Sequence, residues 1–317
     1  MPSPPVGSPG PGDAPPASGP LPDPAAREGL AGETAIADRE GYLARMAQPL
    51  QAKLRIARFV PAGASDVLDV GCADGAVTCA LAALFPETAF LGIDLDGGFV
   101  DRARERAAGK LDTPAVPNAR FERVYLRELL ARPERFDATV FCSVLHEFFT
   151  YGEGTSSVLK ALADAHELLR PGGAILIRDM ILHDYAREST LGAAALRARL
   201  VARCPAHVVA DFERHFGPLD TLERINHLLL KYWYADNWAR ECAEHYVPVS
   251  FEQYADIFRL LGMTRQVAES GTLPFLARKW QTDLGLTAEQ LTPLRSTGIL
   301  VAQKGRAPAS PRGAPLG

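Results

Sequence analysis

The residues whose types and spacing could hold a ligand lie together in the stretch VLDVGCADG at positions 67–75. Asp69 interrupts an apolar run, and Gly71, Ala73 and Gly75 follow it as a G-x-A-x-G turn before a helix-forming segment. This pattern is typical of a buried parallel strand that ends in a tight turn at a helix N-terminus. It predicts that a ligand lies against the backbone of the turn.

Two classes of cofactor compete for this turn. A dinucleotide needs G-x-G-x-x-G, in which the second glycine lets the backbone approach the pyrophosphate, but Ala73 and Ala76 stand at the second and third glycine positions. The carboxylate of Asp69 would also repel a pyrophosphate. S-adenosylmethionine (SAM) has no phosphate, and Asp69 can attract its ammonium group. The turn therefore favours SAM over NAD, and Asp74 is included among the expected cofactor-binding residues.

A second acid, Asp94, ends the apolar run FLGID and lies 25 residues after Asp69. This separation is about one β-α-β unit, and it places a carboxylate where it can accept hydrogen bonds from ribose hydroxyls. We expect Asp94 and the following Leu95 to bind the cofactor. The alternative is that Asp94 caps a helix or lies in a solvated loop.

Three residues could act on an acceptor. His146, after the run FDATVFC, could take a proton from a hydroxyl or amine, or it could pack beside the cofactor. Glu147 lies in the segment HEFFTYGEG, which could hold a cationic or amine substrate or form a solvated loop. Asp179 could orient the substrate, cap a helix or pair with Arg178. Transfer of a methyl group requires positioning and the exclusion of water, so it demands no fixed catalytic motif.

The elements that must position these residues alternate between strand and helix. Apolar runs predict five strands and two later ones, at 66–70, 89–94, 119–124, 136–142, 174–178, 263–268 and 298–303. Because helical segments separate the first five, we expect a doubly wound, mostly parallel, seven-stranded α/β sheet. Such sheets bind ligands beyond the ends of their strands, where four candidates fall: Asp69, Asp94, Ser143 and Asp179. Ser143 is therefore a further expected cofactor contact.

The remaining segments predict tails and helical insertions. Residues 1–33 and 305–317 are rich in proline and glycine, which predicts disorder. Residues 34–304 are expected to form one domain. It opens with a helical lead-in at 35–59 and carries a helical cap at 181–247 over the site.

Several side chains of these insertions have more than one interpretation. In the lead-in, three residues could reach the carboxylate of the cofactor: Tyr42, Arg45 and Lys53. In the cap, four aromatic residues could line an apolar acceptor pocket or pack as core: Tyr232, Trp233, Tyr234 and Trp238. Three neighbours are expected to form a solvated face: Glu241, Glu244 and His245. A second insertion at 275–294 carries Trp280.

Composition limits the partners and the compartment. The net charge of −4 gives no general attraction to nucleic acid or to a membrane, and no run is long enough to span a bilayer. A local basic face for RNA could still come from four residues: Arg187, Arg197, Arg199 and Arg203. The five cysteines form no C-x-x-C pair, which predicts reduced thiols and a cytoplasmic protein. His146 and Glu147 begin like the zinc motif H-E-x-x-H, but Thr150 replaces the second histidine, so we expect no metal site.

The order of these elements resembles that of the class I SAM-dependent methyltransferases. Four motifs carry the resemblance: VLDVGCADG at 67–75, LGID at 91–94, FDATVFCSVLHEF at 136–148 and LRPGGAILIRD at 169–179. It spans about residues 54–180 and the late strands that close at Lys304. The resemblance implies a Rossmann-like sheet that binds SAM.

The motifs do not specify the acceptor, and we expect methylation of a small molecule on oxygen, nitrogen or carbon. Methylation of RNA or tRNA is the alternative enzyme, and a SAM-binding protein without transferase activity is the alternative outside catalysis. Family members often carry an acidic or polar residue after the third strand that binds the adenine amino group. Val124 and Tyr125 stand there, so Tyr125 is expected to stack on or cap the ring. Assembly into a homo-oligomer stays an open alternative.

Overall fold

The fold is built around one seven-stranded sheet with the strand order β3-β2-β1-β4-β5-β7-β6. The computed structural model describes residues 49–306, apart from 112, 233 and 235–237. The strands are β1 Asp66–Val70, β2 Ala89–Asp94, β3 Ala119–Arg123, β4 Phe136–Cys142, β5 Leu169–Asp179, β6 Met263–Gly271 and β7 Thr297–Lys304. The predicted seven-stranded α/β sheet is confirmed, and β1, β2 and β4 have their predicted bounds.

The strand pairing explains why the candidate residues gather at one end of the sheet. Strands β1 to β5 pair in parallel, and β7 pairs antiparallel with both β5 and β6. Asp69 of β1 lies beside Gly92 of β2 and Val140 of β4. Because the chain winds away from β1 in both directions, a crevice is expected outside the carboxyl ends of these strands. That end of the sheet holds Asp69, Asp94, Ser143 and Asp179.

Helices cover both faces of the sheet, because alternate residues of each buried strand face opposite layers. Leu68 belongs to a buried cluster that includes Val158 and Phe258 on one face, while Val67 belongs to a second cluster that includes Leu81 on the other. The helices of these layers are α4 Ala76–Leu84, α5 Gly97–Ala107, α6 Leu145–Tyr151, α7 Thr155–Leu168, α13 Phe251–Leu260 and the 3-10 turn η2 Leu126–Ala131.

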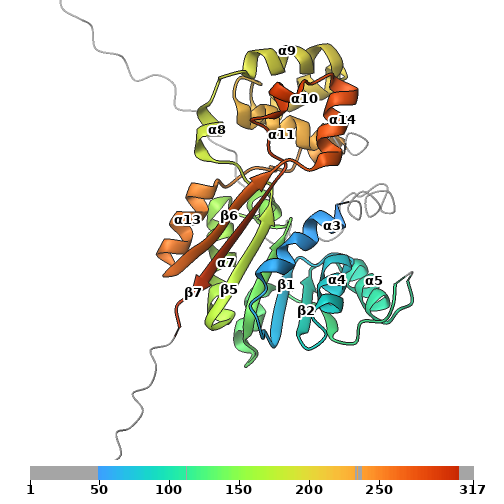
Figure 1. Ribbon diagram of the computed structural model, residues 1–317, viewed down its shortest axis with the longest axis vertical. Coiled ribbons are helices and arrows are strands. Elements are labelled where there is room, and N and C mark those ends of the chain that lie inside the picture. The colour runs from blue at the N-terminus through green and yellow to red at the C-terminus, as the bar shows by residue number, and fades with distance from the viewer. Residues whose placement is uncertain (1–48, 112, 233, 235–237, 307–317) are drawn as a thin grey trace, which may run out of the picture.

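The remaining helices form a cap beyond the carboxyl end of the sheet (Figure 1). They are α8 Asp184–Glu188, α9 Ala193–Arg203, α10 Ala206–Phe216, α11 Leu222–Tyr232, α12 Trp238–Glu241, α14 Pro274–Leu284 and α15 Ala288–Leu291. The two predicted insertions, 181–247 and 275–294, share one hydrophobic cluster. Trp280 is fully buried in it and donates a hydrogen bond from Nε1 to the carbonyl of Leu229 at 3.1 Å. The cap is therefore a second core that both insertions build.

The cap aromatics pack against this core. Tyr232, Tyr234 and Trp238 are partly buried against the cap cluster, as the packing interpretation predicted. Trp233 lies outside the described residues.

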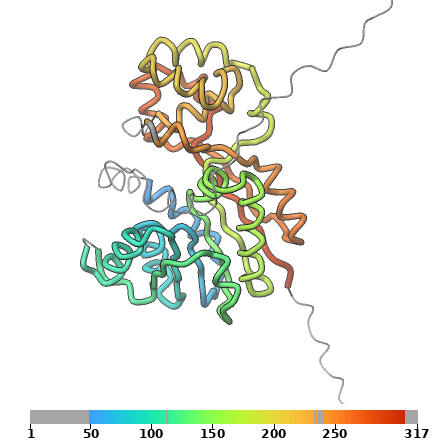
Figure 2. Tube along the Cα trace, turned by 180° about the vertical axis from the view of Figure 1, so that it is seen from behind, coloured from blue at the N-terminus to red at the C-terminus, as the bar shows by residue number. Residues whose placement is uncertain are grey.

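The described part of the lead-in lies at the end of the sheet that faces the cap (Figures 1 and 2). It consists of α3 Leu50–Lys53 and the 3-10 turn η1 Leu54–Phe59. Ile56 is buried in the same cluster as Val67 and so fixes the lead-in to the sheet. Tyr42 and Arg45 lie outside the described residues, as does the predicted tail at 1–33. Of the predicted tail at 305–317, Gly305 and Arg306 are described.

Candidate active site

The turn after β1 contains a buried carboxylate. Oδ2 of Asp69 accepts a hydrogen bond from the hydroxyl of Thr78 at 2.6 Å. Its Oδ1 is buried and has no hydrogen-bond partner in the described part of the chain. Burial raises the pKa of Asp69 to about 7, against the opposing effects of the Thr78 hydrogen bond and the charge of Lys53. A cation placed beside Oδ1 would stabilise the ionised carboxylate.

Glycine is required at two positions of this turn by the backbone and by packing. Gly71 and Gly75 have φ angles of 70° and 72°, in the left-handed region. A Cβ on Gly71 would lie 2.4 Å from Cγ2 of Val144, and one on Gly75 would lie 2.8 Å from the side chains of Ala103 and Phe121. Protein side chains therefore fill the space that a Cβ would take at either glycine. Gly71 also lines the cavity at the turn, so a ligand against its backbone stays a prediction.

The carboxylate of Asp94 connects the ends of β1 and β2. Its Oδ2 accepts a hydrogen bond from the N–H of Ala73 at 2.8 Å, and its Oδ1 accepts one from the N–H of Asp96 at 2.9 Å. Ala73 has a φ of 46°, so this hydrogen bond supports a strained turn residue. The cap of α5 is Asp96, whose side chain accepts from the N–H of Phe99, so the helix-cap alternative for Asp94 is wrong. Burial raises the pKa of Asp94.

Three further expected cofactor contacts have different surroundings. Asp74 forms an ion pair with Arg106 and accepts from the N–H of Ala76 at 3.3 Å, so its carboxylate holds the turn against α5. Leu95 is half-buried directly after β2. Tyr125 is exposed and follows β3 at the start of η2.

A small cavity of about 30 Å³ lies at the glycine turn. It is lined by residues of the turn, of α4, of the end of β4 and of α3: Leu50, Lys53, Asp69, Gly71, Cys72, Ala73, Asp74, Ala76, Val77 and Cys142. Four of the expected cofactor residues therefore share a cavity with the lead-in residue Lys53: Asp69, Gly71, Ala73 and Asp74. The lead-in helix covers the turn. The amino-acid end of the cofactor is expected at the same place, beside Asp69.

At the neighbouring strand ends, a histidine and an aspartate form a buried pair. Nδ1 of His146 lies 2.9 Å from Oδ1 of Asp179, and the backbone N–H of His146 donates to Oδ2 at 3.3 Å. The N–H of Met180 also donates to Oδ1 at 2.8 Å. Burial opposes protonation of His146, but the charge of Asp179 outweighs it and raises the pKa of His146 to about 9. Despite burial, the same contacts hold the pKa of Asp179 below its usual range.

The geometry of this pair leaves one imidazole nitrogen for a substrate. Asp179 engages Nδ1, and Nε2 of His146 has no hydrogen bond to any residue that the structure describes. The ring of His146 meets the ring of Tyr246 edge-on, with centroids 5.4 Å apart. Nε2 is therefore the atom that can exchange a proton with an acceptor. Because the side-chain partner of Asp179 is His146, the predicted alternative pairing with Arg178 is wrong.

Ser143 is held in a strained conformation just before α6. Its φ is 61°, a left-handed value that is uncommon outside glycine and concentrates at functional sites. The N–H of Ser143 donates to the carbonyl of Arg178 at 2.7 Å, and the Arg178 guanidinium donates back to the Ser143 hydroxyl at 2.6 Å. These two contacts set the direction in which the chain enters α6 and carries His146.

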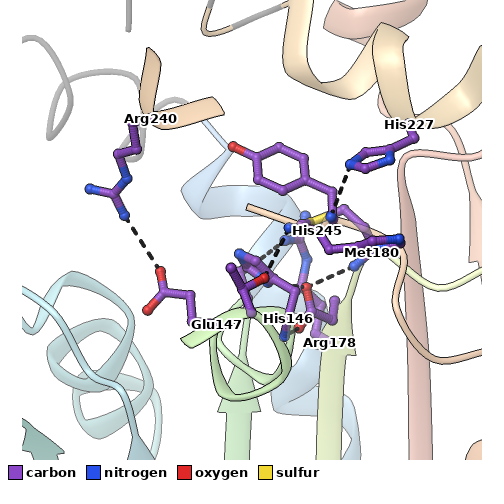
Figure 3. Close-up of polar contacts among 11 residues, drawn as sticks. His146, Glu147, Arg178, Met180, His227, Arg240 and His245 are labelled. Carbon is purple, nitrogen blue, oxygen red and sulfur yellow. Dashed lines mark hydrogen bonds and ion pairs between the residues drawn. The ribbon is translucent and has the colours of Figure 1, made fainter. Parts of the chain in front are cut away.

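An acid of the sheet domain, Glu147, and an acid of the cap, Glu244, both lie near Arg240. Figure 3 shows Arg240 with Glu147. Nη2 of Arg240 lies 2.8 Å from Oε1 of Glu244 and 3.8 Å from Oε1 of Glu147. The hydroxyl of Tyr151 donates to the same Glu244 oxygen at 2.8 Å. The Glu147 side chain is 36% exposed and points toward Arg240 and away from His146. Partial burial and the negative charge of Glu244 raise the pKa of Glu147.

The predicted solvated face of the cap is wrong. Glu241 and Glu244 are 2% and 3% exposed, and His245 is half-buried. The cause is Lys231, whose buried ammonium donates to the backbone carbonyls of Glu241 and Glu244 and lies 4.0 Å from the ring centroid of Tyr246. The lysine turns this segment inward.

Sequence reasoning missed two buried polar residues of α11, His227 and Lys231. Nε2 of His227 accepts a hydrogen bond from the N–H of Tyr246 at 3.1 Å, and burial keeps the pKa of His227 well below its usual value. The two side chains are four residues apart and so share one face of the helix. That spacing within an apolar helical pattern was the signal available in the sequence.

The arginines expected to form a basic face are partly committed to the fold. Arg187 donates to the backbone carbonyl of Pro248 at 2.8 Å, and Arg197 pairs with Glu213 at 3.0 Å.

All five cysteines are unpaired thiols. Across residues 49–306 without the gaps, no group of three His, Cys, Asp or Glu could hold a metal ion. None of the helices in this part of the chain is long and apolar enough to cross a membrane.

Comparison with known proteins finds methyltransferases that are similar to part of this chain. Residues 68–175 match the family model described as a methyltransferase domain. "Probable methyltransferase ltbC" from Aspergillus luteorubrus is 31% identical over 131 residues, which cover 39% of this chain and 44% of that protein. A trans-aconitate 2-methyltransferase from Deinococcus radiodurans is 29% identical over 131 residues, which cover 41% of this chain and 44% of that protein. The chain thus spans less than half the length of these curated relatives.

A solved O-methyltransferase family protein from Burkholderia thailandensis has a TM-score of 0.47 and 16% sequence identity, over 84% of this chain and 60% of that chain. Likeness at this level supports no inference about activity. The matched segment contains the glycine turn, the Asp94 strand end and the His146 segment, within the 3-2-1-4-5-7-6 sheet. Residues 68–175 of this chain are thus similar to a methyltransferase domain.

Proposed function

We propose that this chain transfers a methyl group from SAM to a small-molecule acceptor, on oxygen, nitrogen or carbon. The observation that carries the proposal is the buried Oδ1 of Asp69, which lacks a partner in the described residues and lies within the matched methyltransferase segment. A buried carboxylate oxygen without a partner is costly and marks a place for a cationic group. The ammonium group of SAM meets this requirement, whereas a pyrophosphate would be repelled.

The other strand ends supply groups that suit the rest of the cofactor. The carboxylate of Asp94 lies at the end of β2, where it could accept hydrogen bonds from ribose hydroxyls. Tyr125 is exposed after β3 and presents a ring on which adenine could stack. Leu95 and Ser143 follow β2 and β4 at the same end of the sheet. These residues are therefore suited to binding the ribose and the adenine of SAM.

The His146–Asp179 pair supplies a base for the acceptor. When bound, SAM supplies a methyl group on a sulfonium. An acceptor atom held in line with the bond between sulfur and methyl can take that methyl group, and the sulfur leaves as a thioether. Nε2 of His146 would accept the proton of the acceptor as its new bond to the methyl group forms. Asp179 would hold the imidazole through Nδ1 and stabilise the imidazolium that results. Glu147 of α6, whose side chain faces the cap, would bind a hydrogen-bond donor of the substrate.

Three observations support a small acceptor over RNA. The cap lies beyond the strand ends that carry the base, which favours an enclosed site. Arg187 and Arg197 of the expected basic face are engaged within the fold. One relative is named for trans-aconitate, which is a small molecule. We assign residues 34–304 to the methyltransferase domain and the cap at 181–247 to the acceptor site.

The location is also part of the proposal. Five unpaired thiols, four of them buried, suit a reducing compartment, and we place the protein in the cytoplasm. Fractionation of the cells that make it would test this assignment.

A labelling experiment tests the activity. Purified protein is incubated with SAM that carries a labelled methyl group, together with separated metabolite and RNA pools. We expect label in the metabolite pool. The rate should not fall steeply between low and high salt, because a small-molecule acceptor, unlike RNA, does not bind through a row of phosphate groups. Label in RNA alone would contradict the small-molecule acceptor. Binding of SAM without transfer to either pool would favour the non-catalytic alternative.

A further inference from the structure

A fully buried lysine of the cap, Lys231 of α11, holds the backbone of residues 241–246. Its Nζ donates hydrogen bonds to the carbonyls of Glu241 and Glu244, the second at 2.6 Å. Burial lowers the pKa of Lys231 to about 8, against the charges of the same two acids, so its amine is mostly protonated at neutral pH. A buried charge is unfavourable unless its hydrogen bonds are made. The lysine and this segment therefore stabilise each other.

The same segment is fixed at Tyr246 by two residues of α11. The ammonium of Lys231 lies 4.0 Å from the centroid of the Tyr246 ring, which is a cation–π contact. Nε2 of His227 accepts a hydrogen bond from the N–H of Tyr246 at 3.1 Å (Figure 3). Burial and the charge of Lys231 keep the pKa of His227 well below its usual value, so this nitrogen stays an acceptor. One face of α11 thus fixes both the ring and the backbone of Tyr246.

The side chain of Tyr246 in turn contacts the proposed base. The rings of His146 and Tyr246 meet edge-on, with an angle of 70° between their planes and 5.4 Å between their centroids. Both side chains are buried. Asp179 holds the imidazole at Nδ1, and the tyrosine ring limits the tilt of the rest of the imidazole. The direction of Nε2 therefore depends on where the tyrosine is held.

Neighbouring contacts keep residues 241–246 against α6, the helix that carries His146. The N–H of His245 donates to the hydroxyl of Thr150 at 2.9 Å. The ring of His245 also packs against that of Phe149, with centroids 5.5 Å apart. This segment therefore links the buried face of α11 to the helix of the proposed base.

We propose that Lys231 and Tyr246 form a positioning pair for the proposed base. The lysine fixes residues 241–246, and the tyrosine ring holds the imidazole of His146 so that Nε2 faces the acceptor. The inference rests on the proposed function, because the direction of Nε2 matters only if His146 takes a proton from an acceptor. In this arrangement the lysine acts through the tyrosine and not through contact with the acceptor.

Nuclear magnetic resonance of the histidine ring protons tests the contact without any need for activity. The ring current of a tyrosine shifts the signals of protons that lie against it, so the signals of His146 report the place of Tyr246. His146→Gln, which lacks these signals, identifies them. We expect Tyr246→Leu to move them and Lys231→Met to move them in the same direction, because both changes take the ring away from the imidazole.

Two further variants are controls for the signals. Tyr246→Phe keeps the ring and should leave the His146 signals close to their wild-type positions. Lys279→Met changes another lysine of the cap, whose Nζ lies 5.3 Å from the ring centroid of Tyr232. It is the matched control for the loss of a cation beside an aromatic ring, and it should not move the His146 signals.

The rate of methyl transfer tests the consequence for the reaction. SAM with a labelled methyl group is supplied together with the separated metabolite pool, and the maximal rate and the half-saturating SAM concentration are measured. We expect K231M and Y246L each to lower the maximal rate by ~10–100-fold, because a base displaced by about 1 Å works poorly. The half-saturating SAM concentration should not change. Since the lysine acts through the tyrosine, the double variant should lose no more than Y246L alone, and K279M should react at the wild-type rate.

Other outcomes separate this role from a purely structural one and from the proposed function. Losses of rate that multiply in the double variant, or His146 signals that stay in place in K231M, would overturn the positioning pair. If K231M does not fold, Y246L decides: an unchanged rate overturns the pair, and a lower maximal rate at an unchanged half-saturating SAM concentration supports it. A wild-type protein that transfers no label, but whose His146 signals respond as expected, would contradict the proposed function and not the contact.

Discussion

The imidazole of His146 is a stronger base than a free histidine because its partner carries a full negative charge. Asp179 is buried and accepts three hydrogen bonds, two of them from His146 and one from Met180. The resulting pKa of about 9 means that most of His146 is protonated at neutral pH. Proton abstraction by Nε2 requires the neutral form, so the pair should work best in mildly alkaline solution.

The variant Asp179→Asn tests this assignment through the pH dependence of the rate. In the wild type, kcat/KM should rise with pH up to an inflection near 9, as His146 loses its proton. Without the carboxylate, burial lowers the pKa of the imidazole and only the charges of Glu147 and Glu244 oppose it, so the inflection should move well below 9. The maximal rate should fall by ~10²-fold or more, because the imidazole is no longer held.

A control variant and a contradicting outcome complete this test. Glu153→Gln, at an exposed acid paired with Lys160, should leave the pH profile unchanged. A D179N profile that coincides with that of the wild type would exclude His146 as the base.

The sequence sufficed to locate the acids that end apolar strands, and it failed for the buried Lys231. Asp69, Asp94 and Asp179 could be located because a carboxylate at the end of an apolar run is conspicuous. Lys231 is engaged by backbone carbonyls of a segment ten or more residues away, so its burial depends on tertiary structure. For the same reason, Glu241 was predicted to be solvated and is buried.

Among the elements, the glycine turn shows how packing and ligand binding can be confused in a motif. The turn was predicted from its glycines, and its position after β1 is as expected. The reason for Gly71 differs, because the space in front of it belongs to Val144 at the start of α6. Gly71 therefore brings the first turn of the cofactor site against the segment that carries His146.

Gly71→Ala should destabilise the protein by more than backbone strain alone. An alanine in the left-handed region costs about 1–2 kcal/mol, and the contact with Val144 should add about 1–3 kcal/mol. Gly192→Ala is the matched control, because Gly192 has a φ of 74° and no other atom lies within 4 Å of the position that a Cβ would take there. Denaturant unfolding of both variants measures the difference. Equal losses would show that the Val144 contact has no effect.

Strand β5 shows where element prediction from sequence stops. Its predicted start was residue 174, because Pro171, Gly172 and Gly173 are typical of a turn. In the structure β5 begins at Leu169, and the N–H of Gly172 donates to the carbonyl of Gly305 at 3.1 Å. The partner lies more than a hundred residues away, so local sequence could not reveal the extension.

At the scale of the whole molecule, the cap is joined to the sheet domain by polar contacts around α6. The hydroxyl of Tyr151 reaches Glu244, and the hydroxyl of Thr150 accepts from the N–H of His245 at 2.9 Å. Arg240 of the cap also lies near Glu147. Because α6 carries His146, these contacts fix the cap relative to the proposed base.

Tyr151→Phe should weaken this connection. It removes a hydrogen bond to a buried carboxylate, so the free energy of unfolding should fall by about 1.5–3 kcal/mol. Tyr185→Phe, at an exposed tyrosine of the cap, should be close to neutral. Chemical denaturation of the three proteins provides the comparison. Equal stability of Y151F and the wild type would show that the contact does not hold the cap.

The place of β7 in the sheet has a consequence for how the protein is made. This strand pairs with both β5 and β6, although it follows both of them in the sequence. On the ribosome, β5 and β6 therefore emerge before the strand that joins them, and each waits with an open edge. The backbone N–H and C=O groups at the edge of β5 along Ile175, Leu176 and Ile177 stay unpaired until residues 297–304 arrive. Chaperones that shield strand edges would have most effect in that interval.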